Sequence, residues 1–202
     1  MEDAIPTQIW LIRHGQTEWS RIGAHTGRTD LPLTKAGREE ALSIGRTLNK
    51  RRFAMVLTSP LERARETCAL AGYEGDAELD PNLREWDYGD YEGKSTAQIR
   101  EADPHWSIWV SGVPSGETIQ EVGARAEAII RRAVGVGGDV ALFGHGHSLR
   151  ILAARWVGLP PTAGRLFTLE TATVSILGHE RETQVITRWN LSCVPGQSSG
   201  PA

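Results

Sequence analysis

Two short apolar segments of this sequence, residues 9–12 and 140–143, each run directly into a polar segment in which a histidine is followed by glycine. Apolar runs of this length are typical of strands buried inside a parallel sheet. Because the carboxyl ends of parallel strands meet at one edge of a sheet, His14 and His145 are expected to share one crevice. The pattern therefore predicts an α/β fold with its chemistry at that edge.

Amphipathic helices are predicted around these strands. Thr34 is a favourable N-cap, and Ala41, Ile44 and Leu48 recur after it at intervals of three and four, so this helix is expected to pack one face on the sheet. The other predicted elements are strands at residues 55–57, 173–177 and 184–189 and helices at residues 61–70, 119–133 and 148–156. Residues 72–93 are rich in Gly, Asp, Glu and Pro, which predicts a loop excursion over the sheet edge.

The composition is that of one globular domain. A chain of 202 residues, 40% hydrophobic and 23% charged, can bury a sizeable core, and we expect one domain over residues 1–194 with a disordered tail at 195–202. A formal net charge of -3 favours neither nucleic acid nor an anionic membrane as a partner. No apolar run is long enough to span a bilayer, no basic leader is evident, and Cys68 and Cys193 match no disulfide framework. A soluble, cytoplasmic protein with reduced thiols is expected.

Four segments, in this order along the chain, resemble the motifs of the histidine phosphatase, or phosphoglycerate mutase-like, superfamily. They are Leu-Ile-Arg-His-Gly-Gln-Thr-Glu-Trp at 11–19, Thr-Ser-Pro-Leu-Glu-Arg-Ala-Arg-Glu-Thr at 58–67, Leu-Arg-Glu-Trp-Asp-Tyr-Gly at 83–89 and Gly-His-Gly-His-Ser-Leu-Arg at 144–150. Within that family, residues 84–93 are most similar to the branch of acid and sugar phosphatases that includes sedoheptulose-1,7-bisphosphatase. The resemblance implies a three-layer α/β/α sandwich around a mostly parallel sheet, and a metal-independent enzyme that works through a phosphohistidine.

The resemblance also assigns the catalytic residues. His14 becomes the phosphorylated residue, while Arg13, Arg63 and His145 form the cradle for the phosphoryl oxygens, because a site without metal needs side-chain donors. The guanidinium charges are expected to keep His14 neutral, with its other ring nitrogen bonded to a backbone carbonyl. Glu85 is the expected proton donor to the leaving group and the later activator of water. Asp87 is the reserve candidate for that role.

A second set of residues is expected on the substrate side. Gln16, Thr26 and Gly27 align with substrate-lining positions and offer neutral hydrogen bonds, although ordinary turn chemistry explains them equally well. Ser20 stands where mutases of the family carry asparagine, so its contact with substrate is expected to differ from theirs. His147 is assigned to the pocket wall, as a substrate contact or a structural hydrogen-bonder. No third ligand accompanies the histidines of the last motif, so no metal site is predicted.

The leading hypothesis is a phosphatase that hydrolyses phosphomonoesters of small metabolites, sugar phosphates or bisphosphates, with no cofactor. The alternative enzyme is a cofactor-dependent phosphoglycerate mutase. Such mutases carry a longer insertion with a basic pair after the Tyr-Gly segment, whereas residues 93–115 here lack adjacent arginines, and a less enclosed pocket favours hydrolysis.

A third hypothesis is a non-catalytic phosphate-binding or interaction module. Such members of the family usually lose the first histidine or an arginine, and this chain keeps every expected catalytic residue. The expected partner is a small phosphorylated metabolite. A homodimer is also left open, because many soluble enzymes are dimers.

Overall fold

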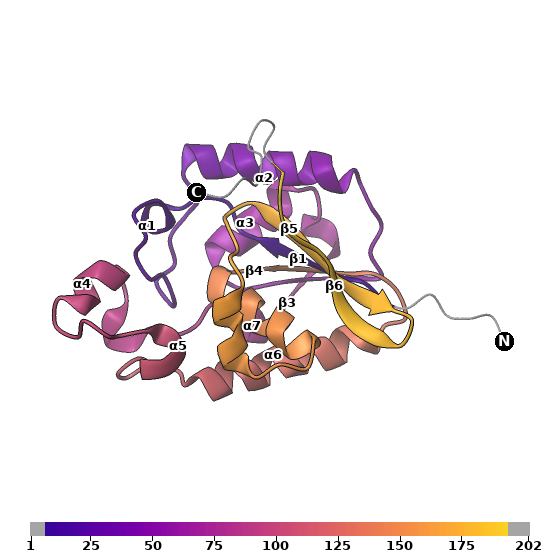
Figure 1. The fold of residues 1–202 in the computed structure, drawn as a ribbon. Helices are drawn as coiled ribbons and strands as arrows, with labels where there is room; N and C mark the ends of the chain where they lie inside the picture. Colours follow the sequence, from indigo (N-terminus) through magenta and orange to yellow (C-terminus); the bar gives the residue numbers. More distant parts are fainter. Residues whose placement is uncertain (1–6, 194–202) are drawn as a thin grey trace.

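The two apolar runs become neighbouring parallel strands at the centre of one sheet (Figure 1). The computed structural model describes residues 7–193. Its strands are β1 (Ile9–Arg13), β2 (Met55–Thr58), β3 (Ala77–Leu79), β4 (Val140–Gly144), β5 (Thr173–Glu180) and β6 (Thr183–Ser192), in the order β3-β2-β4-β1-β5-β6 across the sheet. The strands from β3 to β1 run parallel, whereas β5 pairs antiparallel with β1, and β6 with β5. The predicted, mostly parallel α/β sheet is confirmed.

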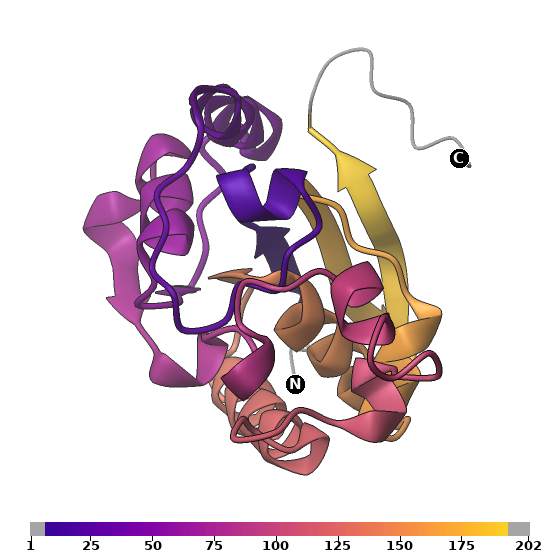
Figure 2. The same ribbon diagram turned by 90° about the vertical axis from the view of Figure 1, so that its left-hand side faces the viewer.

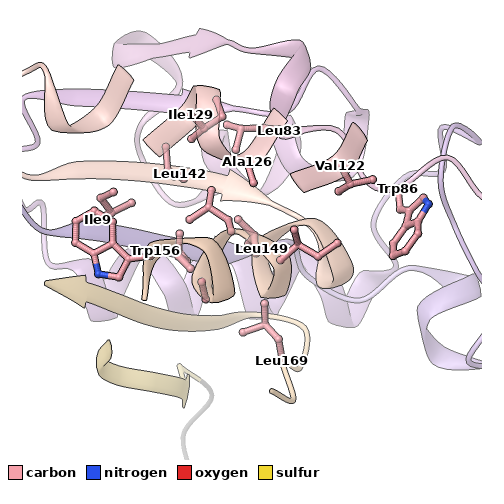
Figure 3. Packing of buried hydrophobic residues seen from close by; sticks show 14 of the residues in the cluster. Ile9, Leu83, Trp86, Val122, Ala126, Ile129, Leu142, Leu149, Trp156 and Leu169 are labelled. Atoms are coloured by element: carbon pink, nitrogen blue, oxygen red, sulfur yellow. The ribbon is translucent and has the colours of Figure 1, made fainter. Parts of the chain in front are cut away.

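Helices cover both faces of this sheet. They are α2 (Lys35–Leu48) and α3 (Glu62–Leu70) on one face and α6 (Ile119–Val134) and α7 (Gly146–Trp156) on the other. Because successive strand residues point to opposite faces, Leu11 and Leu142 pack with α6 and α7, whereas Ile12 and Phe143 pack with α2 and α3. Figure 3 shows the first of these two clusters, in which Trp156 of α7 lies beside Ile9 of β1. The strands are therefore buried on both sides, as their uninterrupted apolar runs predicted.

The helix boundaries follow local chemistry. Thr34 caps α2, with its side chain accepting a hydrogen bond from the Gly37 N–H, as predicted. Helix α3 begins at Glu62, one residue later than predicted. Helix α7 begins at Gly146, two residues before the predicted start, because His145 is already the extended N-cap residue. The early start places the first backbone amides of α7 beside the crevice.

Residues 72–93 are more ordered than the predicted loop excursion. They contain strand β3 and the single-turn helices η1 (Glu74–Asp76), η2 (Pro81–Leu83) and η3 (Gly89–Tyr91). Strand β3 gave no sequence signal because it is a three-residue edge strand whose Glu78 and Leu79 are both exposed. The loop prediction was wrong for these segments.

Short helices surround the carboxyl ends of the parallel strands. They are α1 (Glu18–Arg21), α4 (Thr96–Arg100) and α5 (Ile108–Ser111), and Figure 2 views them from that end of the molecule. A bridge between Ala24 and Ser95 joins the α1 region to the α4 region. Together these segments wall the crevice into which the strands deliver their histidines.

The described residues do not test the expectations for the chain ends. The predicted tail at 195–202 lies outside them, and a single domain over residues 1–194 stays a prediction. Among residues 7–193, no helix combines the length and the hydropathy that crossing a membrane requires.

Candidate active site

Strands β1 and β4 deliver two histidines to the same crevice. Arg13 lies opposite Gly144 in the parallel register, and the His14 N–H donates to the Gly144 carbonyl oxygen at 3.1 Å. The rings of His14 and His145 meet edge to face, with centroids 5.1 Å apart, and both side chains are buried. The two strands bring the histidine rings together as expected, but only His14 lines the pocket.

The His14 ring is held in one tautomer. Its Nδ1 lies 2.7 Å from the Gly15 carbonyl oxygen, and since a carbonyl oxygen can only accept, Nδ1 carries the hydrogen. The predicted bond to a backbone carbonyl is confirmed. Burial, followed by the charges of Arg63 and Arg13, lowers the pKa of His14 well below its ordinary value. The imidazole is therefore neutral, with its lone pair on Nε2.

The glycine after each histidine has a steric reason. A Cβ on Gly15 would lie 2.3 Å from the Gly37 carbonyl oxygen of α2, so only glycine lets the chain turn there. A Cβ on Gly146 would lie 3.3 Å from Cζ of Arg13. The second glycine thus makes room for the guanidinium that ends β1.

Arg13 presents an incompletely bonded guanidinium to the pocket. Its Nη1 donates to the Leu169 carbonyl oxygen, while its buried Nε has no partner among the described residues. Because Arg13 lines the pocket, its guanidinium can form charge-assisted hydrogen bonds with a bound anion. Arg13 is therefore suited to hold an oxygen of a phosphoryl group.

Arg63 and His145 are fully buried and do not line the pocket. The Arg63 Nε donates to His145 Nδ1 at 3.2 Å, and its terminal nitrogens donate to the carbonyl oxygens of Thr26, Gly27 and Thr29 at 3.0 Å each. Because Nδ1 of His145 accepts, its Nε2 carries the hydrogen, which faces Ser59 Oγ at 2.8 Å. Burial, then the Arg63 charge, lowers the pKa of His145 well below its ordinary value, so this ring is a neutral donor.

Glu85 faces the pocket with its carboxylate fixed by backbone amides. Oε1 accepts from the N–H groups of Trp86 and Ser148 at 2.9 Å, and Oε2 accepts from the His147 N–H at 3.0 Å. Two of these donors belong to the first turn of α7, where a negative charge is favourable. Asp87, the reserve candidate, does not line the pocket and instead pairs with Arg28 at 2.8 Å. The geometry thus favours Glu85 over Asp87.

A pocket of about 360 Å³ opens in front of Arg13, His14 and Glu85. Ser20, Thr26 and His147, all expected on the substrate side, line it.

Gln16 and Gly27 do not line this pocket. The Gln16 side-chain oxygen accepts from Thr34 Oγ1 at 3.1 Å, and the Gly27 N–H donates to Glu92 Oε1 at 2.8 Å. The sequence left two roles open for these residues, a place at the pocket or ordinary turn chemistry. In the structure both residues hold turns in place, and neither lines the pocket.

Several pocket residues carried no assigned role in the sequence interpretation. Tyr88 and Trp106 supply an aromatic wall beside His25, and Trp109 continues it beside His147. Arg100 and Arg150 add two guanidinium groups. A signal existed for Arg150, which follows His147 by three residues and so shares its face of the helix. The residues from 96 to 109 gave no such signal, because short helices in loops have little periodicity.

The histidines of the last motif do not form a metal pair. His145 is bonded to Arg63 and Ser59, whereas His147 Nδ1 lies 2.6 Å from Tyr88 Oη. Within residues 7–193, no group of three or more His, Cys, Asp or Glu side chains is placed to hold a metal ion.

Comparison with known proteins agrees with this geometry. The model of the histidine phosphatase superfamily, branch 1, matches residues 9–192, and the chain belongs to this superfamily. It is 40% identical over 177 residues to an acid phosphatase of Mycobacterium tuberculosis, an alignment that covers 86% of this chain and 87% of the relative. It is 39% identical over 181 residues to the sedoheptulose 1,7-bisphosphatase of Saccharomyces cerevisiae, covering 74% and 67% of the two chains. A solved structure of a Mycobacterium tuberculosis open reading frame superposes with a TM-score of 0.87 at 36% identity, over 93% of this chain and 99% of that one.

Proposed function

We propose that the protein is a metal-independent phosphatase that hydrolyses phosphomonoesters of small metabolites through a phosphohistidine on His14. The observation that carries this proposal is the tautomer of His14, whose Nδ1 donates to Gly15 and leaves a lone pair on Nε2 beside the Arg13 guanidinium. Relatives named as acid phosphatase and sedoheptulose 1,7-bisphosphatase support the same class of reaction.

The proposed reaction has two steps. In the first, His14 Nε2 attacks phosphorus, the bond between phosphorus and the leaving oxygen breaks, and protonated Glu85 gives its proton to that oxygen. In the second, Glu85 takes a proton from water, the hydroxide attacks phosphorus, and the phosphorus–nitrogen bond breaks to return the lone pair to Nε2. Inorganic phosphate leaves, and Glu85 is protonated again for the next cycle.

The remaining charged and polar groups stabilise the transferred phosphoryl group. Arg13 lines the pocket and acts by its guanidinium charge, and Arg63 acts by its buried charge and by holding His145. In this proposal the Nε2–H of His145 stops donating to Ser59 Oγ and donates to a phosphoryl oxygen instead. Such preorganised donors contribute most where charge develops in the transition state.

The charge of the pocket supports a substrate with a second anionic group. Arg13, Arg100 and Arg150 line it against the single carboxylate of Glu85, and neither Arg100 nor Arg150 has a carboxylate partner among the described residues. Arg150 stacks on Trp109, 4.6 Å from its ring centroid, and burial lowers the pKa of Arg150 to about 10. Arg150 is half-buried, and a partly desolvated cation without a counter-charge favours an anion there. We therefore favour a sugar bisphosphate over a monophosphate.

The test compares the wild type with His14→Ala on a panel of sugar mono- and bisphosphates, phosphoglycerates and an aryl phosphate, with EDTA present and free phosphate as the readout. His105→Ala is the matched control, because His105 is an exposed histidine outside the pocket. We expect release by the wild type and the control and none by His14→Ala. Turnover by His14→Ala would overturn the mechanism, and interconversion of phosphoglycerates without phosphate release would make the protein a mutase.

We also propose that the protein works in the cytoplasm. Cys68 and Cys193 are both free and buried, which fits a reducing compartment.

A further inference from the structure

Tyr88 and His147 form a buried hydrogen-bonded pair in the wall of the pocket. Tyr88 Oη lies 2.6 Å from His147 Nδ1, both residues line the pocket, and Tyr88 is only 2% exposed. The pair sits beside Glu85, which accepts the backbone N–H of His147. The proposed mechanism uses neither side chain.

The direction of this hydrogen bond follows from the available acceptors. Burial raises the pKa of Tyr88 well above its ordinary value and lowers the pKa of His147 well below its own, so both groups are neutral. A neutral phenol must place its hydrogen, and His147 Nδ1 is the acceptor that the described residues offer to it. Tyr88 therefore donates, and the imidazole carries its own hydrogen on Nε2.

The Nε2–H of His147 opens into the pocket. This nitrogen has no hydrogen-bond partner among the described residues, and it is not sealed inside the protein, so a ligand in the pocket can reach it. Its ring is held edge to face against Trp109 and Trp86, with centroids 5.1 Å and 6.3 Å away. The donor therefore points from a fixed ring, with little freedom to turn away.

We propose that Tyr88 is a positioning residue that fixes His147 as the Nε2–H tautomer, so that His147 donates a hydrogen bond to an uncharged oxygen of the leaving group. This inference rests on the proposed phosphatase function and adds a specificity element to the same pocket. The group that His147 recognises is a hydroxyl, ring or carbonyl oxygen of the substrate. A neutral N–H suits a neutral acceptor, whereas the nearby arginines suit anions. The aromatic side chains around His147 can pack against the carbon atoms of a sugar that carries such oxygens.

The first test measures the tautomer and needs no activity. Nitrogen NMR of the imidazole ring distinguishes an Nε2–H ring from an Nδ1–H ring. We expect His147 as the Nε2–H form in the wild type and in Tyr91→Phe, a matched loss of a phenol outside the pocket, and a mixture of tautomers in Tyr88→Phe. An Nδ1–H ring in the wild type overturns the proposal, whether or not the protein proves to be a phosphatase.

The second test measures selectivity as the ratio of kcat/KM for a sugar phosphate to that for an aryl phosphate. Tyr88→Phe is expected to lower this ratio about tenfold, mainly through KM for the sugar phosphate, since one hydrogen bond is lost. His147→Gln keeps an N–H donor that needs no tautomer and should retain most of the ratio, and adding Tyr88→Phe to it should cost little more. An equal loss on both substrates, or a full further loss in the double variant, contradicts the positioning role.

Discussion

His14 and His145 leave adjacent strands in register, yet the surrounding protein treats the two rings in opposite ways. Among the residues that the structure describes, only the Nδ1 of His14 has a hydrogen-bond partner, so its Nε2 is left with a lone pair. Both nitrogens of His145 are occupied, by Arg63 and by Ser59. The same strand-end position thus gives a ring with a free lone pair in one case and a fixed N–H donor in the other, and the partner of Nδ1 decides which.

The most demanding way to break this comparison is to remove each ring in turn. His14→Ala is expected to lower kcat at least about 10⁴-fold, because the nucleophile itself is lost. His145→Gln keeps a donor and should lower kcat only about 10²-fold, typical of a weakened oxyanion contact. Single-turnover kinetics on an aryl phosphate measure both effects. Equal losses in the two variants would show that the rings do not differ in role.

The stability of the protein should depend on pH because its buried histidines are neutral. Burial lowers the pKa of His14, His145 and His147 well below 6.5, so below that pH the unfolded chain binds more protons than the folded one. The stabilisation is fully present above pH 6.5 and is lost as the pH falls toward the folded pKa values, by up to about 1.4 kcal/mol per pH unit for each histidine.

Denaturant titrations at a series of pH values check this slope. In His147→Gln one of these groups is gone, so the slope below pH 6.5 should become shallower. A free energy of unfolding that stays constant through that range would mean that these rings are not held neutral.

The difference between His145 and His14 depends on Arg63, which donates a hydrogen bond to the Nδ1 of His145. Arg63→Met removes the donor to His145 Nδ1 and leaves the carbonyl oxygens of Thr26, Gly27 and Thr29 buried without it. We expect a loss of about 3 kcal/mol in the free energy of unfolding together with a fall in kcat. Arg63→Lys keeps the positive charge but loses the planar guanidinium, whose several N–H groups bond more than one acceptor at once. The lysine variant should therefore recover part of the activity and little of the free energy of unfolding. Full recovery of stability by lysine would contradict the anchoring role.

The smallest expected effect is that of Arg150, which lines the pocket. Arg150→Met should raise KM for a sugar bisphosphate about tenfold while changing KM for the monophosphate less, because only the bisphosphate has a second anion to bind. Arg165→Met, an exposed arginine outside the pocket, is the matched control. Equal changes on the two substrates would remove the argument for a second anionic group.

The sequence predicted the strand-end half of the site better than its outer wall. Apolar strands and their polar ends are encoded locally, so His14, Arg13 and His145 could be placed at the sheet edge from the sequence alone. The inward turn of Arg63 could not be foreseen, because it depends on carbonyl oxygens more than thirty residues away in the chain. The wall formed by residues such as Trp109 likewise depends on how short, weakly periodic segments pack on one another.

The most direct measurement traps the covalent intermediate and locates it. Glu85→Gln is mixed with an aryl phosphate, whose good leaving group needs no proton, so phosphorylation can proceed while hydrolysis is slowed. The reaction is quenched in alkali, where phosphohistidine is stable, and the modified peptide is identified by mass spectrometry. The account predicts one phosphoryl group on His14, attached through Nε2. A phosphoryl group on His145, or turnover with no covalent species, would contradict it.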